Sequence, residues 1–107
     1  MLAPLTALQF ATFEELYPAR ERSGRELRYA LAKNHNVKRS APAFYQMMSR
    51  LEEGGLVKGW YVEKVIDGQR IKERRYRLEG KGVTAWEQTR DFYSRASLGA
   101  GHAAGGA

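Results

Sequence analysis

The residues best suited to chemistry lie in residues 40–51, where amide, guanidinium, phenol and hydroxyl groups share one stretch, SAPAFYQMMSRL. Gln46 and Arg50 stand four positions apart, so both occupy one face if the stretch is helical. An amide can form two hydrogen bonds to an adenine edge, and a guanidinium two to a guanine edge. These side chains are therefore candidates for contacts to DNA bases. For Arg50, the alternative is an ion pair with Glu53 one turn further on.

Neighbouring hydroxyl and basic groups suit phosphate oxygens, which carry no sequence information but position a protein on the duplex. The candidates for phosphate contacts are Ser40, Tyr45, Ser49 and Arg39. The candidates for attraction that is independent of sequence are Lys38, Lys64, Arg70, Lys72 and Arg74. For each of these residues, the alternative is a solvated surface side chain.

The composition argues against catalytic and metal chemistry. The chain has no cysteine, which removes thiolate nucleophiles, disulfides and thiolate metal sites. His35 and His102 lie far apart in the sequence, and neither stands beside a paired acid, so we expect no catalytic residue, no metal and no cofactor. His35 falls between two asparagines and is interpreted as a turn residue.

Positive charge is concentrated in the middle of the 107-residue chain, whose net charge is +6. Residues 20–50 contain eight Lys or Arg against two acids, and residues 57–82 contain eight against four. Such a distribution indicates a polyanionic partner. The alternative is a basic surface that only keeps the protein soluble.

The first half of the chain predicts three helices. Residues 2–17 have helical spacing, but their apolar side chains, including Leu5, Leu8 and Phe13, cover more than one face. They indicate either a partner subunit or deep burial in one domain. Ser23-Gly-Arg-Glu26 has the form of a capping box and starts a second helix, which we expect to end near residues 32–33.

The third helix spans residues 40–51. Ser40 is suited to cap it, and Pro42 is tolerated in a first turn. Phe44, Met48 and Leu51 form one apolar stripe, and Gly54-Gly55 is a stop signal. Two helices joined by a short polar turn match a helix-turn-helix.

A β-hairpin follows, with strands predicted at residues 57–66 and 69–78 around an Asp67-Gly68 turn. Its root is apolar and its middle and tip are charged, as expected when the root joins a core and the tip projects. A helix-turn-helix followed by a hairpin predicts a winged helix, an α+β and mostly helical fold with three helices and a two-stranded wing.

A last helix is predicted over residues 81–94, with a large apolar load in Trp86, Phe92 and Tyr93. Exposed apolar patches of this kind mark partner surfaces, although packing on the first helix of the same chain is the alternative. We assign residues 1–80 to the DNA-binding domain, 81–96 to a dimerisation helix and 97–107 to a disordered Gly/Ala tail. The predicted dimerisation residues are Leu5, Leu8, Phe13, Trp86, Phe92 and Tyr93.

Together these residues resemble the PadR family of transcriptional regulators. The resemblance rests on Gly24-Arg-Glu-Leu27, on residues 44–57 (FYQMMSRLEEGGLV) and on Arg74-Arg-Tyr-Arg-Leu78, and it covers about residues 20–82. The chain departs from the family pattern at Arg25, Gln46 and Glu79, where the family usually has an aromatic residue, a proline and a threonine. The resemblance implies a homodimer joined through the C-terminal and N-terminal helices.

The resulting hypothesis is a homodimeric, sequence-specific regulator of transcription that binds double-stranded DNA at a pseudo-palindromic operator. Repression and a possible small-molecule effector are implied by the resemblance. The alternative is a winged-helix module that binds a protein or a small effector through Trp86 and the dimer seam. No apolar run is long enough to span a bilayer and the start lacks a basic signal-peptide region, so we expect a cytoplasmic location without membrane association.

Overall fold

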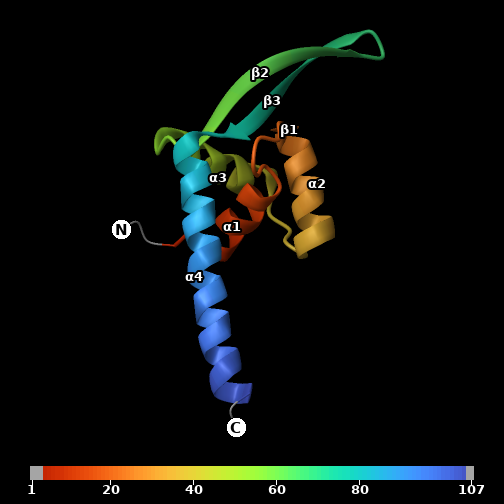
Figure 1. Cartoon of the computed structure of the whole chain (residues 1–107). Coiled ribbons are helices and arrows are strands. Elements are labelled where there is room, and N and C mark those ends of the chain that lie inside the picture. Colours follow the sequence, from red (N-terminus) through yellow and green to blue (C-terminus); the bar gives the residue numbers. More distant parts are fainter. Residues whose placement is uncertain (1–3, 106–107) are drawn as a thin grey trace.

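The computed structural model describes the fold of residues 4–105 and the side chains of residues 4–96. It is an α+β fold of four helices and a three-stranded antiparallel sheet, which confirms the predicted winged helix-turn-helix (Figure 1). The elements in chain order are α1 (Ala7–Glu14), β1 (Arg22–Ser23), α2 (Gly24–His35), α3 (Ala41–Glu53), β2 (Val57–Ile66), β3 (Gln69–Leu78) and α4 (Gly80–Gly105).

α1 is shorter than the predicted helix over residues 2–17, whose first two residues lie outside the described part. Thr6 and Gln9 form a capping box, because the Thr6 hydroxyl accepts the Gln9 N–H while the Gln9 side chain accepts the Thr6 N–H. This cap starts the helix at Ala7, and the helix ends at Glu14, well before Pro18. The apolar spacing correctly located α1 but could not give its ends, which depend on capping.

The caps of α2 and α3 follow the sequence closely. Ser23 and Glu26 form the predicted capping box, and the Ser40 hydroxyl caps α3 by accepting the Ala43 N–H at 3.3 Å. The end of α2 was predicted two to three residues too early. The helix continues to His35 because Asn36 takes the left-handed conformation, with φ of 54°, that terminates a helix.

β2 and β3 form the predicted hairpin, which projects from the body as the wing (Figure 1). Asp67 and Gly68 both have positive φ, 52° and 78°, as the tight turn between two such strands requires. Tyr76 and Leu78 at the root are buried, whereas the side chains around the turn are exposed.

A two-residue strand, β1, extends the sheet beyond the two strands that were predicted. β1 pairs with β3, with Arg22 opposite Tyr76 and Ser23 opposite Arg75. Two residues carry no alternating pattern, so a sequence cannot reveal such a strand. Ser23 therefore serves both as the last residue of β1 and as the cap of α2, which fixes the start of α2 against the sheet.

The core joins α1, α2, α3, the root of the wing and the first turns of α4. Phe13, Leu27, Met48 and Tyr76 are fully or almost fully buried within it. Because each of these residues comes from a different element, burial of their side chains holds the helices and the wing root together.

α4 packs along α1 through aromatic contacts. Trp86 stacks on Tyr17, with ring centroids 3.9 Å apart, and on Phe10 at 5.5 Å. Leu5 donates its N–H to the Thr89 hydroxyl at 3.0 Å, which closes the start of the chain onto the same helix. Phe10 is half-buried, so these contacts leave part of the seam between the two helices accessible.

Three predicted dimerisation residues are buried by this packing and are corrected here. Leu5, Phe13 and Trp86 are 7%, 0% and 7% exposed within the single chain, so they hold the core instead of facing a partner. Phe92 and Tyr93 are exposed on α4, and Leu8 is half-buried. The sequence showed many apolar residues in the first and last helices, but it did not show which of them are buried within the single chain.

α4 also runs further than predicted. The sequence indicated a last helix ending near residue 94 and a disordered tail over 97–107, whereas the helix continues to Gly105. Each added residue of an existing helix contributes one backbone hydrogen bond without needing a packed neighbour, and alanine is the residue that favours this most. Residues 106 and 107 lie outside the described residues.

The ends of α1 and α2 are joined through a buried carboxylate, Glu15. Its Oε2 lies 3.0 Å from Nε2 of His35 and accepts from the Asn34 amide, while its Oε1 lies 3.7 Å from the Arg22 guanidinium. Burial alone would raise the pKa of Glu15, but the hydrogen bonds from His35 and Asn34 and the charge of Arg22 lower it below its ordinary value of 4.5.

Because the pKa of Glu15 is lowered, we expect the stability of the fold to depend on pH. A carboxylate whose pKa is lower in the folded than in the unfolded chain stabilises the fold fully at pH values above its unfolded pKa. This stabilisation is lost as the pH falls through the pKa of the folded chain. Urea midpoints should therefore fall as the pH drops below about 4.5. Glu15→Gln should lower the midpoint at pH 7 and flatten this dependence, whereas Glu53→Gln, at an exposed carboxylate, should not. An unchanged pH profile in Glu15→Gln would contradict the assignment.

Candidate nucleic-acid interface

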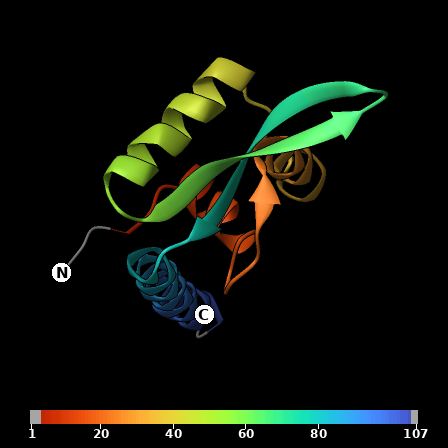
Figure 2. The ribbon, with the colours of Figure 1, turned by 90° about the horizontal axis from the view of Figure 1, so that it is seen from above.

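α3 has one buried and one exposed face, as its sequence predicts. Phe44, Met48 and Leu51 are between 0% and 3% exposed and fix the helix to the core. Gln46, Ser49 and Arg50 are exposed on the other side. Seen from above, α3 lies at the edge of the molecule, with the hairpin between it and α4 (Figure 2). The amide and the guanidinium are thus free to meet another surface.

The predicted competitor for Arg50 does not form. Within the described part of the chain, Arg50 makes no ion pair with Glu53 or any other carboxylate. A guanidinium has five N–H donors in a planar fork, and here they remain available for a planar acceptor such as a guanine edge.

The residues before α3 are basic and exposed. Lys38, Arg39 and Ser40 lie in the connection between α2 and α3, and Arg28 holds this connection by donating to the Arg39 carbonyl at 3.4 Å. The Ser40 oxygen accepts from the helix start, and its own O–H remains a donor. Phosphate oxygens at the start of α3 would meet these cations. Among the first three helical residues only Ala41 would offer its N–H, because Pro42 has none and the Ala43 N–H donates to Ser40.

Tyr45 reaches across to the start of α2, where Gly24 makes room for it. A methyl group built on Gly24 would lie 2.5 Å from the Tyr45 hydroxyl oxygen, closer than any unstrained contact. The missing side chain thus lets the half-exposed phenol sit beside the first turn of α2. Gly24 belongs to the segment on which the family resemblance rests.

The wing residues divide into two groups. Arg70 and Lys72 are exposed near the tip, and Lys64 forms an ion pair with Glu73 at 2.9 Å while staying about half-exposed. Arg74 differs from them, because its guanidinium pairs with Glu52 of α3 and lies 4.6 Å from the centre of the Tyr61 ring. Arg74 therefore joins the wing to α3, and we remove it from the set of predicted phosphate contacts.

The pKa values of Arg74 and Tyr76 at this junction reflect a partly buried ion pair. Burial acts to lower the pKa of Arg74, but the Glu52 carboxylate raises it above its usual range. Burial, followed by the charge of Glu52, raises the pKa of Tyr76 to about 12. Sequence reasoning missed Glu52 and Tyr61 as positioning residues, because no pattern links Glu52 with a residue 22 positions away.

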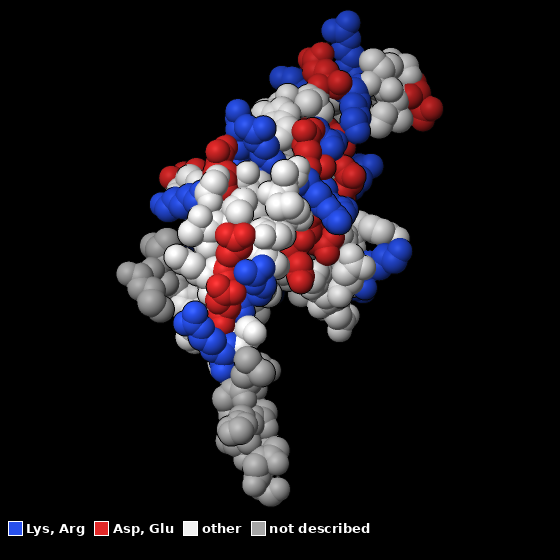
Figure 3. All heavy atoms as spheres, viewed as in Figure 1, with Lys and Arg blue, Asp and Glu red and all other residues white. Residues whose placement is uncertain are grey.

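Charge is mixed over the visible face of the molecule. Figure 3 shows Lys and Arg interspersed with Asp and Glu along the wing and upper body, so no continuous positively charged patch covers this side. Many of the carboxylates form ion pairs within the chain. Arg75 alone contacts Glu21, Glu26 and Glu73 at 2.8–3.4 Å. Lys38 and Arg39 before α3, and Arg70 and Lys72 toward the wing tip, are among the exposed cations that form no ion pair within the described residues.

Two other kinds of site find no support in the described residues. No three His, Asp or Glu side chains among them gather as metal ligands would. No helix that the structure describes is long and apolar enough to cross a membrane.

Solved structures of transcriptional regulators share this architecture. A PadR-like transcription factor from Bacteroides fragilis superposes with a TM-score of 0.73 at 18% identity, over 89% of this chain and 87% of that one. A PadR-family regulator from Eggerthella lenta gives 0.70 at 21% identity, over 88% and 78%. The chain has the PadR-like winged-helix fold. The resemblance found in residues 20–82 is thereby confirmed at the level of the fold.

Bacillus subtilis PadR, solved in complex with operator DNA, is also similar, with a TM-score of 0.64 at 17% identity. The match covers 80% of this chain but 47% of PadR, so the chain spans about half the length of that protein. No protein-family model matches the sequence, and comparison with curated proteins finds no relative. The likeness to PadR therefore rests on shape and on the segments named above.

Proposed function

We propose that this protein is a sequence-specific regulator of transcription that binds double-stranded DNA as a homodimer. The observation that carries the proposal is the exposed face of α3, where Gln46 and Arg50 stand beside each other with no intramolecular partner for Arg50 among the described residues. A major groove about 12 Å wide admits one helix, and amide and guanidinium groups distinguish adenine and guanine there.

The remaining contacts would position the duplex. Lys38, Arg39 and Ser40 would meet the phosphates at the start of α3, and Tyr45 and Ser49 those along its side. Arg70 and Lys72 would approach the backbone from the wing, with Lys64 adding to the local positive charge. The solved PadR–operator complex shows that a protein of this fold binds operator DNA.

The homodimer is supported by α4. Phe92 and Tyr93 are 46% and 44% exposed, and Leu8 of α1 is half-buried. α4 also continues beyond the body of the molecule (Figure 1). A two-fold pair of chains would cover these aromatic rings and place two α3 helices about one DNA turn, roughly 34 Å, apart on a pseudo-palindromic operator. Repression would follow if this dimer occupies a promoter.

The test is DNA affinity measured against salt. An operator is first selected from random-sequence duplexes, and binding is then followed by fluorescence anisotropy from low to high salt. Four exposed cations in each chain (Lys38, Arg39, Arg70 and Lys72) predict a slope of log K against log salt of about −7 for the dimer. An affinity for the operator that barely changes with salt concentration would contradict the proposal.

Matched variants assign that slope to residues. Lys38→Gln should reduce its steepness by about 2 for the dimer, since one phosphate contact is lost in each chain. Arg95→Gln removes an equally exposed cation from α4 and should leave the slope unchanged. A sizing measurement run alongside should show a dimer; a monomer bound to a palindromic site would contradict the assembly.

A further inference from the structure

The two long strands of the wing turn one face toward the body of the molecule and the opposite face away from it. Val57, Tyr76 and Leu78, at the root, point to the body and are buried. Because side chains alternate along a strand, the residues between these point to the opposite side, which we call the outer face of the wing. The outer face comprises Lys58, Trp60, Val62, Lys64 and Ile66 of β2 and Gln69, Ile71, Glu73, Arg75 and Arg77 of β3.

Two cations lie opposite each other at the root of the outer face. Lys58 and Arg77 are partners in the register of β2 and β3, and both are exposed. Neither forms an ion pair with a carboxylate of the described residues. Like charges that face each other directly across two strands destabilise the pairing. This arrangement therefore works against the hairpin itself, and a negative group from outside the chain would relieve it.

A strip of apolar side chains continues from the two cations toward the tip. Trp60 and Val62 are half-buried, and Ile66 and Ile71, diagonal neighbours across the hairpin, are 46% and 41% exposed. Exposed apolar side chains that lie together within a polar rim mark interaction surfaces. Aliphatic groups form no hydrogen bond with a phosphate or a base edge, so this strip favours the side chains of a protein over the backbone of DNA.

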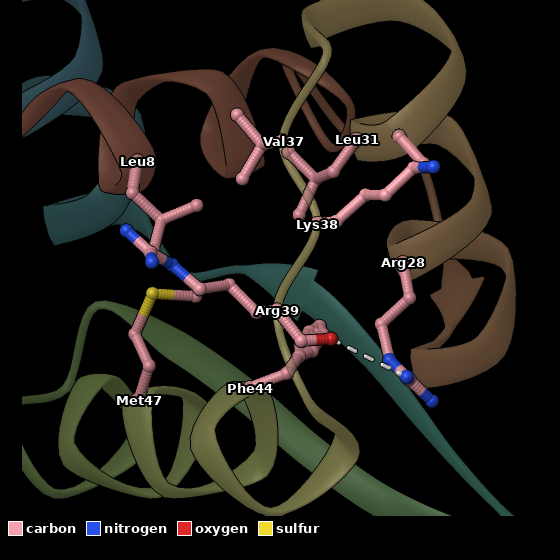
Figure 4. Close-up of a pocket in the computed structure, with 9 residues that line it drawn as sticks. Leu8, Arg28, Leu31, Val37, Lys38, Arg39, Phe44 and Met47 are labelled. Carbon is pink, nitrogen blue, oxygen red and sulfur yellow. Dashed lines mark hydrogen bonds between the residues drawn. The ribbon is translucent and has the colours of Figure 1, made fainter.

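The charge without a partner on the outer face is positive. Glu73, the carboxylate of this face, already contacts Lys64 at 2.9 Å and Arg75 at 3.0 Å. The outer face is also separate from the cavity between α1, α2 and α3 (Figure 4), because no residue of β2 or β3 is among the described residues that line that cavity. A partner for the outer face must therefore supply both carboxylates and apolar side chains.

We propose that the outer face of the wing binds an acidic amphipathic helix of a partner protein. The apolar stripe of that helix covers Trp60, Val62 and the two isoleucines, and its carboxylates pair with Lys58 and Arg77. The strand from Lys58 to Ile66 is about 27 Å long, which corresponds to about 18 residues of helix. A helix packed on strands is also one of the ordinary ways in which proteins cover an apolar sheet face.

The probe is a synthetic helical peptide of that length, with leucine at every third or fourth position and glutamate elsewhere. Anisotropy of the labelled peptide, titrated with the full chain in the absence of DNA, should show saturable binding that weakens as salt is added. The same peptide with lysine in place of glutamate should bind at least about 10-fold more weakly. Equal affinity for the two peptides, or no saturable binding of the acidic one, overturns the proposal.

Two single charge reversals on β3 locate the site. Arg77→Glu should weaken binding of the acidic peptide by at least about 5-fold. Arg70→Glu reverses an exposed cation of the same strand that points to the opposite face, so it should leave peptide binding within about 2-fold. Operator DNA should show the reverse pattern, with affinity kept in Arg77→Glu and weakened in Arg70→Glu.

Other patterns are equally decisive. If Arg77→Glu weakens operator binding and leaves peptide binding unchanged, Arg77 contacts DNA and the proposal is overturned. If the unmodified chain binds the acidic peptide but no DNA under any condition, the proposed function fails while this surface stands, so the two failures are distinguishable.

Unfolding in urea tests the two facing cations directly. Arg77→Glu places an acid opposite Lys58, so its urea midpoint should lie above that of the unmodified chain, and Lys58→Glu should behave in the same way. Each variant should therefore gain stability while it loses peptide affinity, which a purely structural role would not produce. If neither midpoint rises, the two cations do not oppose each other in the fold and the proposal is overturned.

Discussion

Replacing Gly82 with alanine is expected to destabilise the fold by about 3 kcal/mol, although alanine normally favours a helix over glycine by about 1 kcal/mol. A methyl group built on Gly82 would lie 2.1 Å from the backbone oxygen of Leu56. That oxygen accepts the Glu79 N–H at 3.0 Å, so it cannot move aside without breaking the bond that joins the wing root to α4. The measurement is the free energy of unfolding in urea.

Gly80→Ala is the matched control for this experiment. Gly80 lies two residues earlier in the same helix, and a methyl group built there meets nothing within 4 Å. It should be neutral or stabilising by up to about 1 kcal/mol, in line with helix propensity. If both variants unfold at the same urea concentration, the close approach of α4 to Leu56 is not as described.

Replacing Arg50 with alanine is expected to weaken operator binding by roughly 30-fold or more. A good bidentate base contact contributes about 1–3 kcal/mol, and the proposed dimer makes the contact twice. The loss should also be specific, with discrimination relaxed at one base pair in each half-site. The measurement is anisotropy with the selected operator and with each of its single-base variants, after confirming the fold by circular dichroism.

Arg95→Ala, on α4, removes the same charge from an exposed position and should retain operator affinity within about 2-fold. A second outcome for Arg50→Ala would assign this residue a different contact. If affinity falls equally on all sequences and the salt slope becomes shallower, Arg50 contacts a phosphate and not a base.

Features that depend on a few neighbouring residues were predictable from the sequence. The Ser23–Glu26 capping box, the Ser40 cap and the Asp67-Gly68 turn all form as expected, because each is a hydrogen bond or backbone preference contained within four residues. The buried stripe of α3 was also correct, since a 3.6-residue period directly reports which face packs.

Features that join distant parts of the chain were not predictable. β1 is a strand only because Ser23 meets Arg75, and Trp86 is buried only because Phe10 and Tyr17 stack on it. The candidate site shows the same division. Gln46 and Arg50 followed from helical spacing, whereas the ion pair of Arg74 with Glu52 depends on how the wing packs against α3.

The packing of the wing against α3 has a consequence for the kind of DNA that this protein would accept. The Glu52–Arg74 pair and the Tyr61 ring hold the wing at a set distance from α3 before any duplex arrives. If α3 enters the major groove, the wing must then fit the adjacent backbone without adjustment. Groove width varies with base sequence, most of all in narrow A-tracts. The protein would therefore distinguish DNA sequences by the groove width of the duplex at base pairs that it does not contact.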